Sequence, residues 1–406
     1  MPNDDWTRWR QEQFIPIRKA DLVSLLADDE QLASDDREPF LQLCRLLAAT
    51  LHYEYHQRLE ELKNLYACFD PDSDTQALRH VDEKQQLGLC KTLFGQFVEL
   101  LERANYQRLS REQIQQAIGV ASDWGVRLNV DLESFARLEV FSRGDIVETR
   151  TRRRWQNWNR PEQVQVPLYQ RLVVIFQLRP EAQRAPGVDP RRVYIKLFKN
   201  IPTQDLDMLL PGTQFKMSWL DQGKILLPTI SGIAIAVTKI VKGALLLAFA
   251  GFYGILALLG LIGGTIGYGV KSFMGYLRTK DKYQLTLTRS LYFQNLDNNA
   301  GVIHRLLDEA EEQEFREAVL GYALLRRRAG DGGWTEEELD KDAEQFLRET
   351  LGFQVDFEVA DALSKLARLG CATQTRDGRW HAAELGETLI CMDRAWDNFF
   401  SHYQTN

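Results

Sequence analysis

The middle of the chain contains a long stretch that is almost free of charged residues. Residues 225–270 carry two charges, Lys239 and Lys242, and the 28 residues from 243 to 270 carry none. As a helix, those 28 residues would extend about 42 Å, whereas the hydrocarbon core of a bilayer is about 30 Å thick. Helices in soluble cores are rarely apolar on all sides over this length, so the stretch predicts a membrane-spanning segment.

Two membrane topologies fit this stretch. One is a single span within residues 243–270, and the other is a transmembrane helical hairpin over residues 225–270. The positive-inside rule favours the hairpin, because basic residues on both sides place both flanks in the cytoplasm. These flanking residues are Lys216, Lys224, Lys271, Arg278, Lys280 and Lys282.

Glycines in the second half of the stretch have a spacing that is typical of packed membrane helices. Gly260 and Gly264 are four residues apart, and so are Gly263 and Gly267. Small residues at this spacing let two helix backbones approach closely in lipid. Glycine is also common in membrane helices in general, so helix packing and simple abundance both explain the pattern.

Charge divides the rest of the chain. Residues 1–150 sum to −9, residues 151–224 to +7 and residues 331–406 to −9, within a total of −7. A basic segment directly before the apolar stretch is expected to lie against anionic headgroups. We therefore predict an α+β membrane protein, whose parts are a helical domain (1–125), a basic membrane-proximal antiparallel β-sheet (126–224), the hairpin (225–270), a strand and helix connector (271–330) and an acidic winged-helix-like domain (331–406).

The soluble segments are assigned from their hydrophobic periodicity. Residues 40–66 repeat apolar residues at intervals of three and four, which indicates a helix. Between residues 137 and 198, β-branched and aromatic residues partly alternate and predict four or five strands. In the tail, helical segments precede a hairpin signal at Asp377 and Gly378, and this order is typical of a winged helix.

Several strings of residues carry a family resemblance. They are Phe14-Ile15-Pro16-Ile17-Arg18, His52-Tyr53-Glu54-Tyr55-His56, Phe69-Asp70-Pro71-Asp72, Ser142-Arg143-Gly144-Asp145, Lys196-Leu197-Phe198-Lys199-Asn200-Ile201-Pro202, Met208-Leu209-Leu210-Pro211 and Leu296-Asp297-Asn298-Asn299-Ala300-Gly301. In this order they resemble the uncharacterised membrane-protein family that includes transmembrane protein 143, over roughly residues 10–330. The resemblance implies the architecture but no activity. Because an Arg-rich, acid-poor transit segment is absent from the sequence, we expect a bacterial inner-membrane protein with cytoplasmic domains.

Two groups of residues have the spacing of metal ligands. His52, His56 and Glu60 share one helix face and could bind zinc or iron, although an aromatic-rich packing helix explains them as well. Residues 70–74 begin like a calcium loop, but Thr75 stands where that loop needs glycine and Val81 where it needs glutamate. A turn that caps the next helix is therefore the better interpretation of this segment.

Little else in the sequence indicates catalysis. The acidic run beside His304, which contains Asp308, Glu311, Glu312 and Glu314, is interpreted as a solvated helix face. Phosphate loops, dinucleotide-binding glycine patterns and nucleophile elbows are absent from the sequence. The sequence thus indicates no catalytic residue and no cofactor, and it favours a protein that is not an enzyme.

A basic patch with tryptophans precedes the apolar stretch. Arginine with interleaved tryptophan suits anionic lipid at a membrane interface, and it also suits single-stranded nucleic acid or a contact with another domain. Its position beside the apolar stretch favours lipid. The predicted lipid-binding residues are Arg150, Arg152, Arg153, Arg154, Trp155, Trp158, Lys196 and Lys199.

The charge of the tail opposes the DNA binding that a winged helix would suggest. Its recognition helix would carry three acidic residues against Lys365 and Arg368, so phosphates would be repelled. We expect a protein contact instead, either self-association or a dock on the basic residues 150–224, and no nucleic-acid partner. The predicted function is a non-catalytic, membrane-anchored scaffold or sensor. The alternatives are a membrane-bound metal enzyme that uses His52, His56 and Glu60, and an oligomeric transporter or channel subunit.

Overall fold

The structure is a computed structural model of the chain. It describes residues 13–28, 36–75, 82–117, 127–153, 161–181, 187–211, 214–216, 267, 274, 292–352 and 354–399. Its contacts divide the chain into two units. The larger unit consists of Met1–Ser110, Glu133–Thr203 and Leu296–Asn406, and the smaller unit consists of Arg111–Leu132 and Gln204–Asn295.

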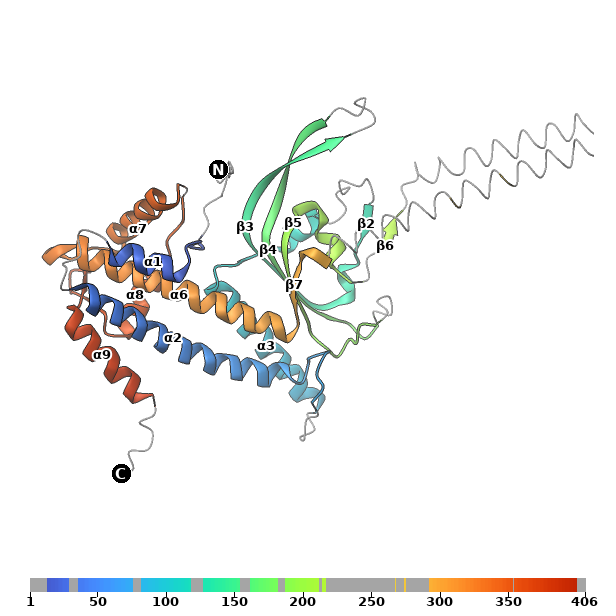
Figure 1. Ribbon diagram of the computed structural model, residues 1–406. Helices are drawn as coiled ribbons and strands as arrows, with labels where there is room; N and C mark the ends of the chain where they lie inside the picture. The colour runs from blue at the N-terminus through green and yellow to red at the C-terminus, as the bar shows by residue number, and fades with distance from the viewer. Residues whose placement is uncertain are drawn as a thin grey trace, which may run out of the picture. The chain divides into compact units, whose positions relative to one another are not determined.

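A five-stranded sheet in the order β1-β3-β4-β5-β7 forms one part of the larger unit (Figure 1). The strands are β1 (Gln107–Arg108), β3 (Phe135–Arg153), β4 (Pro161–Leu178), β5 (Tyr194–Pro202) and β7 (Asn295–Asn298). β3, β4 and β5 pair antiparallel, so that Phe141 lies opposite Val173 and Val173 lies opposite Leu197. Alternate residues of a strand share a face, and this fully buried row therefore marks the face that packs in the core. The antiparallel sheet predicted from the alternating pattern is confirmed.

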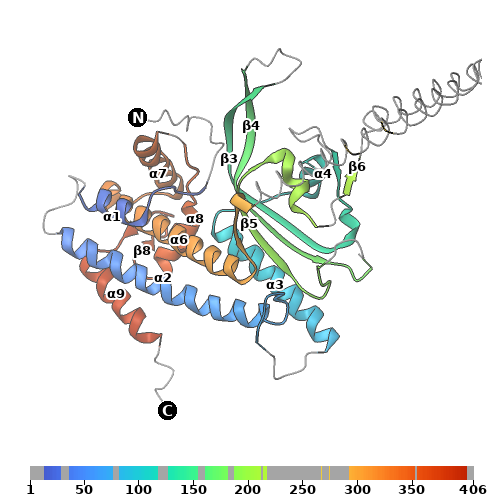
Figure 2. The same ribbon diagram turned by 45° about the vertical axis from the view of Figure 1, so that its right-hand side comes forward.

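Helices cover this face of the sheet. They include α2 (Arg37–Tyr66), α3 (Glu83–Arg103) and α6 (Ala300–Arg328), with the short α1 (Lys19–Ala27) before them. A capping box, in which Asp82 and Gln85 bond each other's backbone N–H groups, starts α3. The first turns of α6 join α3 and the sheet in one hydrophobic core, and α2 runs beside α6 in both views (Figures 1 and 2).

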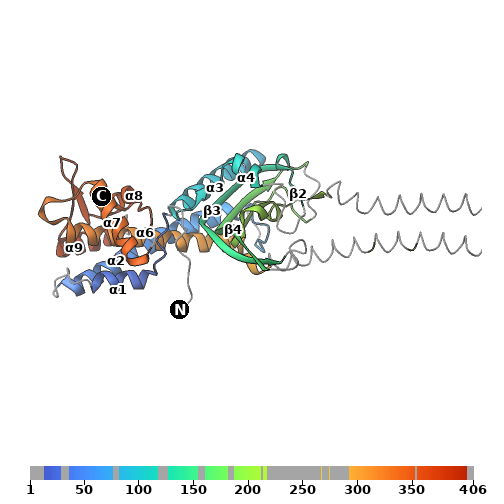
Figure 3. The ribbon, with the colours of Figure 1, turned by 90° about the horizontal axis from the view of Figure 1, so that it is seen from above.

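The C-terminal segment packs on the far half of α6. It consists of α7 (Glu336–Leu351), α8 (Val359–Arg368), the strands β8 (Ala372–Gln374) and β9 (Trp380–Ala382), and α9 (Leu385–Asn398). Figure 3 shows these helices gathered at the end of α6 that is remote from the sheet. The two strands form the predicted hairpin, with Gly378 at a φ of 83°, a conformation that favours glycine.

The smaller unit has few described residues. It contains α4 (Arg111–Ala117), the strands β2 (Arg127–Asn129) and β6 (Gln214–Lys216), and most of the 3-10 helix η4 (Thr203–Leu209). β2 and β6 pair antiparallel, with Leu128 opposite Phe215.

The prediction of a membrane protein is corrected by the described helices. In the described ranges, no helix is both long enough and apolar enough to cross a bilayer. With 30 and 29 residues, α2 and α6 have the length, but charged residues occur along both, and a span needs about 20 mostly apolar residues. Residues 225–270 lie outside the described residues except for Gly267. The fold class is therefore α+β with a five-stranded antiparallel sheet, and we withdraw the transmembrane hairpin and the inner-membrane location.

Candidate functional site

Helix α6 carries polar side chains into the interior of the larger unit. Gln313, Glu314, Arg316 and Glu317 are all at most 5% exposed, although they occupy consecutive turns of the helix with Phe315 and Ala318. A buried charge is costly unless it is paired and hydrogen-bonded. The partners of these four side chains therefore define the candidate site.

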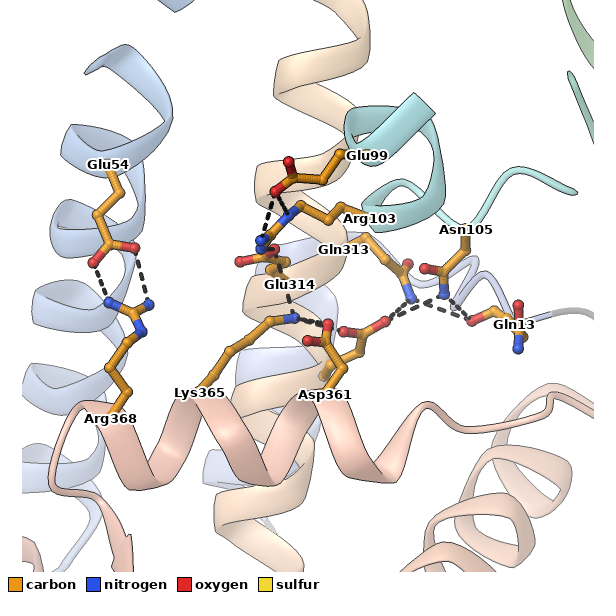
Figure 4. Close-up of polar contacts among 11 residues, drawn as sticks. Gln13, Glu54, Glu99, Arg103, Asn105, Gln313, Glu314, Asp361, Lys365 and Arg368 are labelled. Carbon is orange, nitrogen blue, oxygen red and sulfur yellow. Dashed lines mark hydrogen bonds and ion pairs between the residues drawn. The ribbon is translucent and has the colours of Figure 1, made fainter. Parts of the chain in front are cut away.

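Lys365 of α8 lies between the two glutamates and donates to Glu317 (Figure 4). Its Nζ lies 2.9 Å from Glu317 Oε2, 3.8 Å from Glu314 Oε1 and 2.6 Å from Asp361 Oδ2. The Lys365 side chain is 6% exposed, and the two glutamate side chains are 3% and 1% exposed. The buried ion pairs with the two glutamates thus fix α8 against α6, whereas Asp361, which is 41% exposed, lies on α8 itself.

The last turn of α3 supplies the second set of partners. Arg103 Nη1 donates to Glu314 Oε1 at 3.0 Å, while Nη2 of the same guanidinium donates to Glu99 Oε1 at 3.0 Å. Asn105 Nδ2 donates to Glu317 Oε1 at 3.2 Å and to the carbonyl of Gln13 at 2.8 Å. The network therefore joins α3 and the N-terminal segment to α6 and α8.

Gln313 completes the link to the N-terminal segment. Its Oε1 accepts from the backbone N–H of Ile15 at 3.1 Å and from Arg316 Nη1 at 3.4 Å. Its Nε2 donates to Glu317 Oε1 at 2.8 Å and to the carbonyl of Gln13 at 3.2 Å. We call the set Gln313, Glu314, Glu317, Lys365, Arg103, Asn105 and Asp361 the α6–α8 network.

Carboxylates outnumber cations in the α6–α8 network, and the pKa values of Glu317 and Lys365 are both raised. Burial raises the pKa of Glu317 above its ordinary value, against the opposing effect of Lys365. Burial acts to lower the pKa of Lys365, but the charges of Glu317, Glu314 and Asp361 outweigh it, so that this pKa is raised. The network therefore holds a lysine that stays charged and a glutamate that takes up a proton more readily than usual.

The predicted metal ligands are not brought together. His52 Nδ1 lies 3.0 Å from Glu311 Oε2, and Glu60 accepts from Lys63 Nζ at 2.8 Å. His56 is exposed on α2. Within the part of the chain that the structure describes, no group of three or more His, Cys, Asp or Glu side chains could hold a metal ion.

The segment that begins like a calcium loop holds the start of α6. Asn299, the residue before α6, has an unusual backbone with φ 50° and ψ −123°. Its Nδ2 donates to Asp72 Oδ2 at 2.5 Å, its Oδ1 accepts from the N–H of Ile195, and its own N–H donates to the carbonyl of Ile195. The backbone N–H of Asp72 donates to Asp70 Oδ1, which fits the predicted turn. The expectation that this turn caps the next helix is wrong, because Asp82 caps α3 and Asp72 contacts the residue before α6.

The predicted lipid-binding residues are spread over two strands. Arg150, Arg152 and Arg153 form the end of β3, and Lys196 and Lys199 lie on β5, where both are partly exposed. The other three, Arg154, Trp155 and Trp158, lie outside the described residues. Lipid binding by this patch stays a prediction.

Only one of the four glycines predicted to pack helices is described. Gly267 is an exposed helical residue, and Gly260, Gly263 and Gly264 lie outside the described residues. Packing of a second helix on this motif therefore also stays a prediction.

The interpretation of the acidic run as a solvated helix face is wrong for Glu314, and Glu311, with a side chain 14% exposed, pairs with His52. Glu314 is 2% exposed and ion-paired, whereas Glu312 is 42% exposed. The sequence analysis missed Glu317 and the role of Lys365. A signal was present, because residues 318–325 of α6 carry no charge, and Glu317 directly before such a run must be buried with a partner.

The expected dock of the tail on the basic residues 150–224 is replaced by a different contact. Both basic residues of α8 pair with acidic residues of the helices: Lys365 with α6, and Arg368 Nη2 with Glu54 Oε2 of α2 at 2.9 Å. The tail therefore contacts α2 and α6 through ion pairs of both signs, since its own Glu384 and Asp342 also pair with Arg326 and Arg328 of α6.

One family model matches the chain. The model described as "Protein of unknown function (DUF3754)" matches residues 169–301, about a third of the chain. The matched segment includes most of β4, all of β5 and β7, and the start of α6. This match fits the expected resemblance to an uncharacterised family over these residues. No solved structure matches the chain.

Proposed function

We propose that the chain is a non-catalytic scaffold or sensor that binds a protein partner, which can be a second copy of itself. The observation that carries the proposal is the buried ion pair of Lys365 with Glu314 and Glu317. It holds segments far apart in the sequence in one arrangement, as a presenting scaffold requires.

The contacts of α8 support a protein partner over a nucleic acid. In a winged helix that reads DNA, the recognition helix enters the major groove and basic residues contact the phosphates. Here Lys365 is buried, and Arg368 forms an ion pair with Glu54. We therefore propose that the tail acts through proteins and takes no nucleic-acid partner.

Cross-linking of the intact chain tests this function. The parent protein, Lys365→Ala and the control Lys341→Ala, an exposed lysine on α7, are each recovered from cells and their partners quantified. We expect a stoichiometric partner with the parent and the control, and less of it with Lys365→Ala. A stoichiometric metal ion in the purified parent, lost in His52→Ala and His56→Ala, would overturn the proposal in favour of the metal enzyme.

We also propose that the family relation extends to the group that includes transmembrane protein 143. Its support is that three of the quoted strings contact one another: Asp72 of the string 69–72 accepts from Asn299 of the string 296–301, and Lys196 of the string 196–202 donates to Asn298. No activity or location is carried over. A structure of a member of that group that lacks these contacts would contradict the relation.

A further inference from the structure

A row of basic residues crosses the sheet beside the α6 helix. Arg143 on β3 lies directly opposite Arg171 on β4, and Arg171 lies directly opposite Lys199 on β5. This row is two residues along from the buried row of Phe141, Val173 and Leu197, so alternation places it on the face that the helices cover. Like charges directly opposite each other destabilise a sheet, and three of them in a row require a compensating charge.

Helix α6 adds two more cations to this row and only partly compensates it. Arg305, Glu309, Glu312 and Arg316 follow each other at intervals of four, three and four, which places them on one helix face. Glu309 lies 3.0 Å from Arg143 Nη2 and 3.4 Å from Arg305 Nε. Glu312 pairs with Arg316. We call Arg143, Arg171, Lys199, Arg305 and Arg316 the arginine cluster.

The arginine cluster has more positive charge than its surroundings balance. Its five cations face Glu309 and Glu312, Glu317 of the α6–α8 network also acts on Arg316, and Asp145 lies on the next row of β3, so that five cations meet four carboxylates. Arginine cannot lose its proton at any ordinary pH. Burial lowers the pKa of Arg171, and the charges of Arg143 and Arg305 lower it further against the effect of Glu309.

Several donors in the arginine cluster lack an acceptor. The Nε atoms of Arg143, Arg171 and Arg316 are buried and have no hydrogen-bond partner in the described part of the chain. The side chains of Arg143 and Arg316 are each 6% exposed, and both guanidinium groups lie over the ring of Phe14, at 3.9 Å and 5.4 Å from its centre. A buried donor without an acceptor is costly, so this arrangement calls for a ligand that supplies acceptors.

We propose that the arginine cluster is a binding site for a phosphate group. A phosphate supplies the missing negative charge and several acceptor oxygens at once, and guanidinium groups bind phosphate with paired hydrogen bonds. Arg171, Lys199 and Arg305 are partly exposed, so a phosphate can reach them from solvent, whereas Arg143 and Arg316 are buried. The phosphate belongs either to a free phosphorylated compound or to a lipid headgroup, because both present the same group.

Titration calorimetry of the full chain with inorganic phosphate, at constant ionic strength set with chloride, tests the site. We expect saturable binding that Arg171→Gln and Lys199→Gln each weaken by about tenfold, because each removes a charged donor. Lys196→Gln is the matched control, because it changes a lysine of the same strand as Lys199. Lys196 is three residues from Lys199 and therefore lies on the opposite face of the sheet. We expect it to bind like the parent.

Two outcomes overturn the site. One is a parent protein that shows no saturation at millimolar phosphate, and the other is a loss of binding in Lys196→Gln as large as in Lys199→Gln. Circular dichroism in phosphate-free buffer verifies that the variants fold, and both sheet substitutions are at partly exposed positions. Phosphate binding can fail while the partner experiment with Lys365→Ala succeeds, so the two proposals are tested separately.

A second arm identifies the source of the phosphate. The chain is sedimented with vesicles of phosphatidylcholine, with and without phosphatidic acid. Sedimentation that needs phosphatidic acid and is lost in Arg171→Gln assigns the site to a lipid headgroup. Calorimetric binding without sedimentation assigns it to a free phosphorylated compound.

Discussion

Two buried polar clusters share helix α6 and differ in the sign of their surplus charge. The α6–α8 network has more carboxylates than cations, whereas the arginine cluster has more cations than carboxylates. A surplus carboxylate can take up a proton, and the raised pKa of Glu317 shows this tendency. A surplus guanidinium has no such option. The α6–α8 network can therefore neutralise its surplus charge by protonation, whereas the arginine cluster needs an anion from outside.

The two clusters are joined by one side chain. Gln313 accepts from Arg316 of the arginine cluster and donates to Glu317 of the α6–α8 network. Each cluster can therefore be perturbed by itself, and Gln313 can be changed to separate them. The following substitutions use this arrangement, from the largest expected effect to the smallest.

Lys365→Ala should have the largest effect. It leaves Glu317 buried without a cation, and removing one partner of a buried ion pair typically costs about 3–5 kcal/mol. Urea denaturation measures the free energy of unfolding. Lys341→Ala, at an exposed position of α7, should stay within about 0.5 kcal/mol of the parent. A loss below about 1 kcal/mol in Lys365→Ala would contradict the structural role of the network.

Gln313→Leu should have an intermediate effect. It keeps a similar volume but leaves the N–H of Ile15 and the donor of Arg316 without their acceptor, which costs about 1–3 kcal/mol for buried groups. We also expect faster proteolysis of the N-terminal segment, measured by limited digestion. The control is Gln345→Leu at an exposed position of α7. Equal stability and equal digestion in both variants would show that Gln313 does not join the clusters.

Glu317→Gln should change the pH dependence of stability. Because the pKa of Glu317 is raised in the folded state, the folded protein keeps a proton that the unfolded chain releases. The parent should therefore lose stability as pH rises from the ordinary glutamate pKa of about 4.3 to the raised value, and Glu317→Gln should lack this loss. Melting temperatures across this range measure it.

Glu338 is the control of opposite sign. A backbone hydrogen bond from Thr335 lowers the pKa of Glu338, so its contribution is present above the ordinary pKa and is lost as pH falls. The parent should therefore gain stability as pH rises through the pKa of Glu338, and Glu338→Gln should lack this gain. If Glu317→Gln and Glu338→Gln change the slope of melting temperature against pH in the same direction, the raised pKa of Glu317 is contradicted.

Arg171→Gln should have the smallest effect on stability, and it should stabilise the protein rather than destabilise it. In phosphate-free buffer it removes a like charge opposite Arg143 and Lys199, so we expect a gain of about 0.2–1 kcal/mol. Urea denaturation again provides the measurement, with Lys196→Gln as the neutral reference. A loss of stability greater than about 1 kcal/mol would mean that Arg171 is already compensated.

Much of the fold could be predicted from local patterns. The alternation between residues 137 and 198 identified the antiparallel strands, and Asp377 and Gly378 identified the hairpin of β8 and β9. Apolar residues that repeat at intervals of three and four positions identified α2. These features depend on neighbouring residues and on backbone geometry, and both are present in the sequence.

The membrane prediction shows the limit of such patterns. It rested on the length and the missing charges of residues 225–270, which lie outside the described residues except for Gly267. Among the described helices, none is both long enough and apolar enough to cross a bilayer. The corrected fold class is decided by the elements that the structure contains.

The partners of the buried charges were decided by the tertiary structure alone. The sequence by itself determined that Glu314 and Glu317 lie on one helix next to an apolar run. It did not determine that Lys365, 48 residues from Glu317, would be their counterion, nor that strand register would align Arg143, Arg171 and Lys199. The physical reason is that helix and strand periodicities act over a few residues. The pairing of buried charges depends instead on which elements pack together, and that is settled by burial of the whole core.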